Sequence, residues 1–545
     1  MLLELQGRGY DELRGAFRWK IPAEFNMASA CADRHDPAAL ALVVSQGEDP
    51  GRYSFGDISE LSRRLANALR GLGIGRGDRV GVILPQGLET ALAHLATYRL
   101  GGVAVPLSIL FGPDALRYRL ADSGARAVLT DAAGAEKVLD LAPDLPQVEV
   151  VISTDSAGTR GGSVTSFWEV VRSASTSFET VRTSSEDPAL LIYTSGTTGP
   201  PKGALHAQRV LLGHLPGFEL SHEFFPQPGD LFWTPADWAW IGGLMDALLP
   251  SWYHGIPVVA GARGRFDPEW AFRILGDQGI RNAFFPPTAL KMMRQTDIRP
   301  RNLVLRTVMS GGEVLGEEVL NWGQEALGVT INEIFGQTEA NYVVGNCSAS
   351  WPVRPGSMGR SYPGHDVEVM TAGGKRARAG ETGEICIRTP DPVVFLEYWG
   401  RPDATAEKFR HGWLRTGDMG ERDGDGYLWY RARADDVINS AGYRIGPSEI
   451  EECLLRHGAV ALAAVIGIPD ETRGQAIKAF VVLKGDLDPS SGLEQDIRTF
   501  VRARLAAYQY PREVEFVAEL PLTTTGKVRR TELREMEERR RREAR

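Results

Sequence analysis

Residues Tyr193–Gly203 read YTSGTTGPPKG, and this segment is the clearest indication of the fold class in the sequence. They follow the apolar run ALLIY, which is typical of a buried strand, and they contain three glycines, several hydroxyl side chains and Lys202. Glycines let a backbone approach an anion closely, and consecutive N–H groups form a concave site for it. The sequence therefore predicts a strand that runs into a polyphosphate-binding loop.

Two well-known loop motifs do not fit this stretch. A Walker A loop needs glycine at the position of Pro201 and Ser or Thr at the position of Gly203. A nucleophile elbow centred on Ser195 needs glycine where Tyr193 stands. The remaining alternative is a plain turn rich in Gly and Thr, and the density of hydrogen-bond donors argues against it.

Strands and helices alternate outward from this loop. Residues 57–70 and 88–102 have apolar side chains at helical spacing, and the apolar runs after them predict strands. This alternation predicts parallel sheets that are covered by helices. Segments 382–389 and 426–438 predict β-rich, antiparallel structure, and from about residue 436 the pattern changes to a compact α+β unit. The end, residues 533–545, shows no apolar face and is predicted to be a solvated charged tail.

The composition excludes several classes of protein. The 545 residues carry a net charge of −9, so a general nucleic-acid binder is not expected. The four cysteines contain no CxxC pair, and no apolar stretch approaches the length of a membrane span. The start lacks an apolar signal region, and the C-terminus reads EAR. We therefore expect a cytoplasmic protein, and the sequence leaves its oligomeric state open between monomer and dimer.

Three histidines recur at a regular interval. His206, His214 and His222 are separated by eight residues each. That spacing does not bring three imidazoles to one metal ion, so a metal site is not predicted there.

Six ordered motifs connect the loop to a known family. They are YTSGTTGPPKG, SGGE at 310–313, NEIFGQTE at 332–339, WLRTGD at 413–418, ARADDVINSAGYRIGPSEIE at 432–451 and LPLTTTGKVRR at 520–530. Together they resemble the AMP-forming acyl-CoA synthetases of the adenylate-forming superfamily, and most of all its medium-chain and acetyl-CoA synthetase-like members. The chain departs from the usual pattern at Phe335, where a Tyr is common, and at Ala432, where a Gly is common.

The resemblance implies an α/β fold with two domains. The large N-terminal domain, residues 1–434, would combine mostly parallel sheets flanked by helices with a β-rich subdomain. The small α+β C-terminal domain, residues 435–545, would be mobile about a hinge at Asp435 and would carry Lys527.

The resemblance also implies the reaction, its cofactors and the residues for each step. The expected reaction is ATP-dependent formation of an acyl-adenylate with release of pyrophosphate, followed by transfer of the acyl group to CoA, with Mg²⁺ as the metal. The catalytic residues would be Lys527, Thr338 and Glu339, and Glu339 would bind Mg²⁺. The nucleotide would be bound by Thr194, Ser195, Gly196, Thr197, Thr198, Gly199, Lys202, Gly312, Glu313, Phe335, Gln337, Thr338, Asp418, Arg433 and Arg444. The CoA side would be lined by Ser440, Ala441, Gly442 and Tyr443.

The acid substrate is predicted from three positions: Trp240, Gly311 and Gly336. Acetate-specific relatives usually carry a Trp where Gly336 stands, and Gly311 replaces a branched side chain, so a deeper acyl pocket is expected. Because each buried CH₂ contributes about 0.8 kcal/mol, extra depth favours a short- to medium-chain fatty acid. Acetate or propionate and an aryl acid are the alternatives.

Two further hypotheses concern other classes of activity. A non-catalytic nucleotide-binding module is disfavoured because both Lys202 and Lys527 are present, in a chain with only nine lysines. Acetylation of Lys527 by a lysine acetyltransferase would remove the charge and so regulate the enzyme. Otherwise the expected partner is the small carboxylic acid itself.

Overall fold

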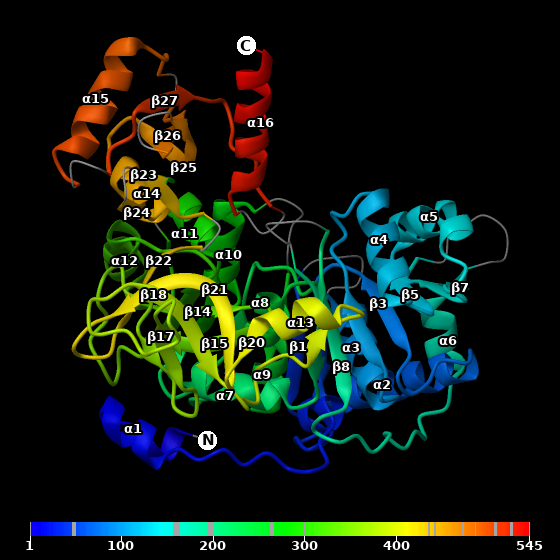
Figure 1. Ribbon diagram of the computed structural model, residues 1–545. Coiled ribbons are helices and arrows are strands. Elements are labelled where there is room, and N and C mark those ends of the chain that lie inside the picture. Colours follow the sequence, from blue (N-terminus) through cyan, green and yellow to red (C-terminus); the bar gives the residue numbers. More distant parts are fainter. Residues whose placement is uncertain are drawn as a thin grey trace. The chain divides into compact units, whose positions relative to one another are not determined.

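The structure is a computed structural model, shown in Figure 1. It describes residues 2–45, 51–155, 164–194, 200–261, 266–298, 300–433, 436–440, 443–470, 474–485, 487–505, 509–523 and 527–543. Its internal contacts divide the chain into two units. The first unit comprises Met1–Thr194, Pro201–Asp366 and Arg388–Gly412, and the second includes Val367–Ile387 and Trp413–Arg545. The predicted hinge, Asp435, lies outside the described residues, so the division into 1–434 and 435–545 stays a prediction.

An eight-stranded sheet in the first unit contains β8 and β9, the strands on either side of the predicted phosphate loop within Tyr193–Gly203. Its strand order is β19-β9-β8-β4-β3-β5-β6-β7. The strands are β3 (Arg79–Ile83), β4 (Val103–Pro106), β5 (Ala127–Thr130), β6 (Val150–Ser153), β7 (Thr165–Ser166), β8 (Pro188–Tyr193), β9 (Gly203–Ala207) and β19 (Glu397–Tyr398). Strands β3 to β8 pair in parallel, whereas β9 runs antiparallel to β8 and to β19. The loop therefore joins the two strands of a hairpin near one edge of this sheet.

Helix α2 (Phe55–Gly71) illustrates why the predicted helices form. Ser54 and Asp57 make a reciprocal cap: the Ser54 hydroxyl accepts the Asp57 N–H, and the Asp57 carboxylate accepts the Ser54 N–H. Its apolar side chains recur at helical spacing and are buried. The neighbouring helices of this layer are α3 (Leu88–Arg99), α4 (Pro113–Ser123), α5 (Ala132–Asp140) and α6 (Phe167–Ser173). The helix predicted at 57–70 is confirmed.

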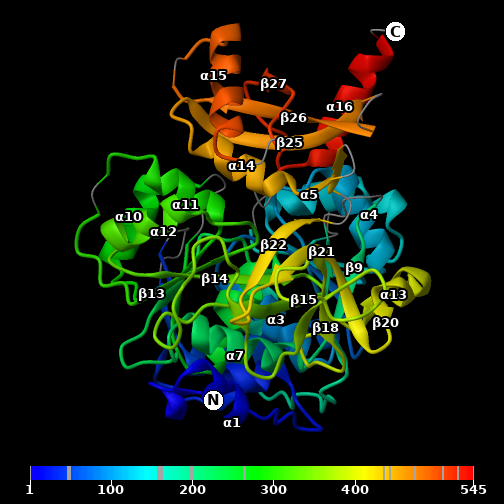
Figure 2. The same ribbon diagram turned by 60° about the vertical axis from the view of Figure 1, so that its left-hand side comes forward.

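A nine-stranded sheet forms the rest of the first unit's core, in the order β16-β15-β14-β13-β12-β10-β11-β1-β2. Its strands are β1 (Leu40–Val44), β2 (Gly51–Ser54), β10 (Phe232–Trp233), β11 (Val258–Ala260), β12 (Asn282–Phe285), β13 (Thr307–Gly311), β14 (Ile331–Gln337), β15 (Ala340–Gly345) and β16 (Arg360–Ser361). The helices around it are α7 (Val210–Ser221), α8 (Ile241–Gly243), the π-helical turn η4 (Leu244–Leu248), α9 (Leu249–Tyr253), α10 (Pro268–Asp277), α11 (Pro287–Arg294), α12 (Glu317–Trp322) and the π-helical turn η5 (Gly323–Leu327). Helices α10, α11 and α12 lie side by side in Figure 2, whereas α7 is buried along its whole length.

Short elements complete the first unit. They are η1 (Leu3–Leu5), α1 (Tyr10–Ala16), the π-helical turn η2 (Ser29–Asp33), η3 (Ala142–Asp144), α13 (Pro402–Lys408) and β20 (Phe409–Arg410).

The second unit contains two groups of antiparallel strands. The first group is β17 (Val367–Met370), β18 (Gly383–Arg388), β21 (Trp413–Arg422) and β22 (Leu428–Arg433). The second is β23 (Ile438–Ser440), β24 (Tyr443–Ile445), β25 (Val460–Asp470) and β26 (Gly474–Leu483), with β27 (Glu513–Phe516) added in parallel to β26. Helices α14 (Pro447–Leu455), α15 (Ser491–Arg502) and α16 (Arg530–Glu543) accompany the second group (Figure 1). The predicted antiparallel β-rich region and α+β unit are both confirmed.

The predicted charged tail is wrong. Residues Arg530–Glu543 form helix α16, and Leu533 on it is 1% exposed and packs in a cluster with Ile466 and Phe480. The carboxylate of Glu537 lies 2.7 Å from the ammonium of the buried Lys478. A few apolar side chains and one buried ion pair therefore hold a helix whose composition alone looks fully solvated.

Candidate functional site

The loop between β8 and β9 is closed at its base by paired backbone groups. Tyr193 pairs with Gly203 in the antiparallel ladder. The Thr194 N–H donates to the Lys202 carbonyl at 2.9 Å, and the Thr194 hydroxyl donates to the same carbonyl at 3.3 Å. These bonds fix both ends of a loop whose predicted residues Ser195, Gly196, Thr197, Thr198 and Gly199 lie outside the described residues.

Lys202 belongs to a chain of charged and aromatic contacts within the first unit. Its ammonium lies 5.2 Å from the ring centroid of Tyr398, a distance typical of a cation–π contact. The Tyr398 hydroxyl donates a hydrogen bond to Oε1 of Glu339, which is 8% exposed. The structure thus brings together two residues that the sequence predicted, Lys202 and Glu339, with Tyr398 between them.

Tyr398 is a functional candidate that the sequence analysis missed. It lies on β19, which pairs with β9 next to Lys202. Tyr398 and Glu339 are 59 residues apart along the chain. Only the strand pairing brings it to Glu339, and the local sequence around Tyr398 carries no signal for that contact.

The end of β14 and the residue that follows it present four more of the predicted first-unit residues. Phe335, Gly336, Gln337 and Thr338 are all partly exposed, and the ladder between β14 and β15 is irregular between Phe335 and Gln337. The Gln337 side-chain oxygen accepts a hydrogen bond from the Lys408 ammonium at 3.4 Å. These residues form one accessible edge at the end of the nine-stranded sheet.

Gly312 and Glu313 follow β13, the next strand of that sheet. Gly312 has φ +101°, a conformation that L side chains rarely adopt, which explains the glycine there. Glu313 is partly exposed beside it. Because β13 and β14 are parallel neighbours, both segments emerge at the same edge of the sheet.

The two glycines of the predicted acyl pocket are packed tightly. A Cβ atom on Gly336 would lie 2.5 Å from the Tyr342 N and from Oδ1 of Asn341. A Cβ atom on Gly311 would lie 2.6 Å from Cδ1 of Ile334. Trp240 is partly exposed, and its ring centroid lies 5.8 Å from that of Phe111. Close packing therefore explains why both positions carry glycine. The assignment of the two glycines to an acyl pocket stays a prediction.

Asp418 and Arg433 lie opposite each other on β21 and β22 in the second unit. Nη1 of Arg433 is 3.3 Å from Oδ1 of Asp418, whose carboxylate is largely buried. The Thr416 hydroxyl accepts the Asp418 N–H at 3.0 Å and donates to the Ile385 carbonyl at 2.7 Å. A carboxylate held in this way is a suitable acceptor for hydroxyl groups.

Lys527 is exposed at the closed end of a loop in the second unit. The Thr523 N–H donates to the Lys527 carbonyl at 2.7 Å, and the Lys527 N–H donates to the Thr523 hydroxyl at 3.0 Å. Three residues later, Arg530 forms an ion pair with Glu451. Its Nη2 lies 2.6 Å from Oε2 and 2.8 Å from Oε1 of that carboxylate. The backbone around Lys527 is therefore held on one side by the loop and on the other by the start of α16.

The remaining predicted residues lie in or near β23 and β24. Ser440 is buried and pairs with Tyr443 and with Gly474. Ala441 and Gly442 lie outside the described residues, as do the side chains of Tyr443 and Arg444.

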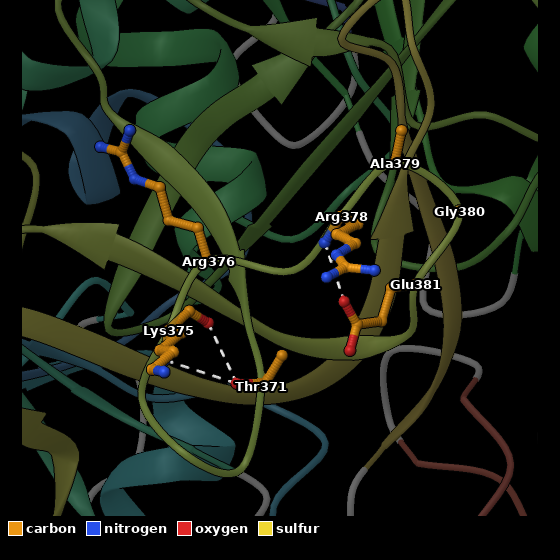
Figure 3. Close-up of a pocket in the computed structure, with 7 residues that line it drawn as sticks. All are labelled: Thr371, Lys375, Arg376, Arg378, Ala379, Gly380 and Glu381. Carbon is orange, nitrogen blue, oxygen red and sulfur yellow. Dashed lines mark hydrogen bonds between the residues drawn. The ribbon is translucent and has the colours of Figure 1, made fainter.

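A surface hollow of about 600 Å³ lies elsewhere in the second unit (Figure 3). The side chains of Lys375, Arg376, Arg378 and Glu381 surround it, and the Arg378 N–H donates to the Glu381 carboxylate at 2.9 Å. None of the residues predicted from the motifs lines it.

Two features are absent from the described residues. No helix among them is long and apolar enough to cross a lipid bilayer. No group of three or more His, Cys, Asp or Glu side chains arranged for a metal ion occurs in the described part of the chain.

Known proteins resemble the chain over nearly its whole length. Residues 29–399 match the family described as AMP-binding enzyme, and residues 449–527 match the AMP-binding enzyme C-terminal domain. The acyl-coenzyme A synthetase ACSM4, mitochondrial, of Rattus norvegicus is 35% identical over 95% of this chain and 91% of its own length. The acetyl-coenzyme A synthetase of Bacillus subtilis is 32% identical over 97% of this chain and 95% of its own.

A solved structure shares the fold. The crystal structure of the anthranilate CoA ligase AuaEII in complex with anthranoyl-AMP superposes with a TM-score of 0.86 at 29% identity. The match covers 95% of this chain and 98% of that chain.

Proposed function

The chain belongs to the AMP-binding enzyme family, and from that premise we propose that it joins a short- to medium-chain fatty acid to CoA. The resemblance seen in the six motifs is thereby confirmed, and so is the class of enzyme, an AMP-forming acid–CoA ligase that uses ATP and CoA. The identity of the acid is the part that this proposal adds.

The reaction has two steps, and each needs an anion to be brought to an electrophile. A carboxylate oxygen attacks the α-phosphorus of ATP, and the bond to the bridging oxygen breaks to release pyrophosphate. The CoA sulfur then attacks the acyl carbon, the acyl–oxygen bond breaks, and AMP leaves while the thiol proton passes to solvent. Positioning and charge neutralisation are therefore the main tasks of the protein.

The observation that supports the adenylation step is the contact chain from Lys202 through Tyr398 to Glu339. It places a cation at the end of the predicted phosphate loop and a fixed carboxylate beside it. The loop residues 194–202, together with Gly312, Glu313, Phe335, Gln337 and Thr338, are proposed to bind ATP. Asp418, Arg433 and Arg444 are proposed to contact its ribose and phosphates, Ser440 to Tyr443 to contact CoA, and Lys527 to act in adenylation.

Glu339 also fits the proposed Mg²⁺. A carboxylate is the hard oxygen ligand that this ion prefers, and Mg²⁺ usually binds through one or two carboxylates together with substrate phosphates. One oxygen of Glu339 accepts the Tyr398 hydroxyl, which fixes the orientation of the carboxylate. When bound, the ion supplies positive charge against the phosphates.

Two other classes of acid are alternatives. The Bacillus subtilis relative is named for acetate, and the solved relative for anthranilate, an aryl acid. The three classes differ in the size and shape of the acyl group, so a substrate panel separates them.

The direct experiment measures pyrophosphate and AMP release with ATP, Mg²⁺ and CoA across linear, branched and aromatic acids. We expect release that depends on both the acid and CoA, with the highest kcat/KM for a linear acid of short or medium length. ADP as the nucleotide product would overturn the reaction. Failure of every acid to drive pyrophosphate exchange would instead favour a non-catalytic nucleotide-binding module.

Regulation and location are proposed on the same basis. Lys527 is exposed, so an acetyltransferase could reach it, and acetylation would remove its charge. Incubation with such an enzyme should lower pyrophosphate exchange in step with modification of Lys527, and full exchange after complete modification would contradict this. We propose a cytoplasmic location from the sequence, although the rat relative is named as mitochondrial.

A further inference from the structure

Asp246 is a buried carboxyl group that the proposed reaction does not use. It lies on the π-helical turn η4 among apolar residues, and its side chain is 4% exposed. The Asn341 amide donates a hydrogen bond to Oδ1 of Asp246 at 2.6 Å. Burial raises the pKa of Asp246 well above its ordinary value, in spite of that hydrogen bond. A group so costly to bury needs a role that an apolar side chain would not fill.

His214 presents a second buried polar atom to the same place. Its Nδ1 lies 2.8 Å from the Val210 carbonyl, which can only accept, so Nδ1 carries the proton. Nε2 is then an acceptor; it lies 3.9 Å from Oδ1 of Asp246 and has no hydrogen-bond partner among the described residues. Burial lowers the pKa of His214 to about 4, so the ring is neutral at pH 7. An acceptor nitrogen and a carboxyl group thus face each other without a direct bond.

These groups lie beside residues that are expected to form the acyl pocket. A Cβ atom on Gly242 would lie 3.6 Å from Oδ2 of Asp246, and Gly242 shares a turn with Trp240. A Cβ atom on Gly336 would lie 2.5 Å from Oδ1 of Asn341, the partner of Asp246. Gly242 and Gly336 are both partly exposed. Gly242 therefore borders Asp246, and Gly336 borders Asn341, with no side chain on either glycine in between.

We propose that Asp246, held by Asn341 and facing His214, forms a polar end of the acyl pocket that selects acids bearing a hydroxyl or amino group. The inference rests on the proposed function and narrows its substrate class. A hydroxyl or amino hydrogen on the acid would donate a hydrogen bond to Nε2 of His214 or to the Asp246 carboxyl group. Without such an acid, Nε2 of His214 has no hydrogen-bond partner among the described residues. A plain acid of the same length leaves them unpaired, and sites built for a hydrogen bond discriminate strongly against analogues that lack it.

The test compares kcat/KM for acid-dependent pyrophosphate release within matched pairs of acids. The pairs are hexanoate against its terminal hydroxy acid, phenylacetate against its para-hydroxy derivative, and benzoate against its para-hydroxy and para-amino derivatives. We expect the substituted acid to be favoured by roughly 10–100-fold in at least one pair. A preference for the plain acid in every pair would overturn the inference.

Variants then assign that preference to Asp246. Asp246→Leu and the nearly isosteric Asp246→Asn should reduce the ratio by at least ~10-fold, mainly through slower use of the substituted acid. Glu219→Gln is the control, because Glu219 is an equally buried carboxylate on α7. This substitution should change stability without changing the ratio of kcat/KM values for the paired acids. An unchanged ratio in a folded Asp246 variant would overturn the inference.

The outcome of the substrate panel distinguishes failure of this inference from failure of the proposed function. If plain acids are activated to AMP and no pair shows a preference, this inference fails and the proposed function stands. If no acid of either kind yields AMP and pyrophosphate, the proposed function itself fails, and this inference fails with it.

Discussion

Tyr398 links a cation and an anion of the candidate site through a single side chain. Its ring lies beneath the Lys202 ammonium, and its hydroxyl donates to the Glu339 carboxylate. Both contacts depend on one phenol. A mutation that removes only the hydroxyl therefore distinguishes the contribution of the hydroxyl from that of the ring.

Tyr398→Phe removes the hydroxyl and keeps the ring. A hydrogen bond to a charged group contributes about 1.5–3 kcal/mol, so kcat/KM for MgATP in pyrophosphate exchange should fall roughly 10–100-fold. The Mg²⁺ concentration needed for half-maximal exchange should rise, because Glu339 loses the donor that orients it. Titrating Mg²⁺ in the exchange assay measures both effects.

Tyr362→Phe is the matched control for that change. The Tyr362 hydroxyl is also buried and donates to the Asn346 carbonyl at 2.9 Å, but it does not contact Glu339. Equal losses in the two variants would show that the effect comes from a buried phenol in general and would remove Tyr398 from the site.

Helices α2 and α3 and the turn η2 meet at one ion pair, in which the arginine is buried and the carboxylate is partly exposed. Arg99 on α3 is fully buried, and its Nη2 lies 2.7 Å from Oδ1 of Asp33 at the end of η2. Ser59 on α2 donates to the same carboxylate oxygen at 2.5 Å. This cluster fixes the helical layer next to the parallel strands of the eight-stranded sheet.

The cluster predicts how stability depends on pH. Burial acts to raise the pKa of Asp33, but the hydrogen bond and charge of Arg99 outweigh it and lower the pKa from 3.8 to about 2. Because the folded pKa lies below the unfolded one, the stabilisation is present above about pH 4 and is lost as the pH falls toward 2. Because the Asp33 carboxylate is partly exposed to solvent, screening reduces this stabilisation at neutral pH to about 1 kcal/mol. Urea unfolding of wild type and Asp33→Asn should differ near pH 6 and converge near pH 2, and a constant gap would contradict the assignment.

Helix α16 is held at its start by Arg530, which reaches Glu451 on α14 and Asp436. Arg530→Ala leaves the largely buried Glu451 carboxylate without its cation and removes one of the two arginines at Asp436, so the second unit should lose about 3–5 kcal/mol. Hydrogen exchange of β26 and urea unfolding measure this loss. Arg529→Ala is the control, because Arg529 is 56% exposed and pairs with Glu532 at the surface, where about 0.5 kcal/mol is expected. Similar losses in both variants would mean that α16 depends on net charge and not on this pair.

Across the whole molecule, the sequence predicted what depends on local pattern and missed what depends on distant pairing. The helix at 57–70 follows from its apolar spacing and its cap. The contact of Tyr398 with Glu339 and that of Arg99 with Asp33 join residues 59 and 66 positions apart, and no local pattern contains them. Gly336 shows the same limit, because its neighbour Asn341 becomes visible only when β14 and β15 are paired.

The two half-reactions should depend on different residues of the second unit. If Lys527 has its proposed role, Lys527→Ala removes a donor to the developing charge and should lower acid-dependent pyrophosphate exchange by ~10²–10³-fold. Thioester formation from supplied acyl-adenylate should stay near the wild-type rate. Lys484→Ala is the control, because Lys484 is another exposed lysine of this unit and should leave both steps unchanged. Equal loss in both half-reactions would reject the role of Lys527.

Gly442→Trp should produce the reverse pattern. If Gly442 leaves room for the thiol arm of CoA, an indole there blocks the arm while leaving ATP and the acid free to react. Pyrophosphate exchange should therefore persist, whereas conversion of supplied acyl-adenylate to acyl-CoA should fall by at least ~10²-fold, the scale on which misplacing a reacting group acts. Gly458→Trp, a bulky change at an exposed glycine of the same unit with open space around it, controls for general disruption. A CoA step that is unaffected by Gly442→Trp would show that the thiol reaches the adenylate by another route, and the proposed CoA-side residues would then have to be abandoned.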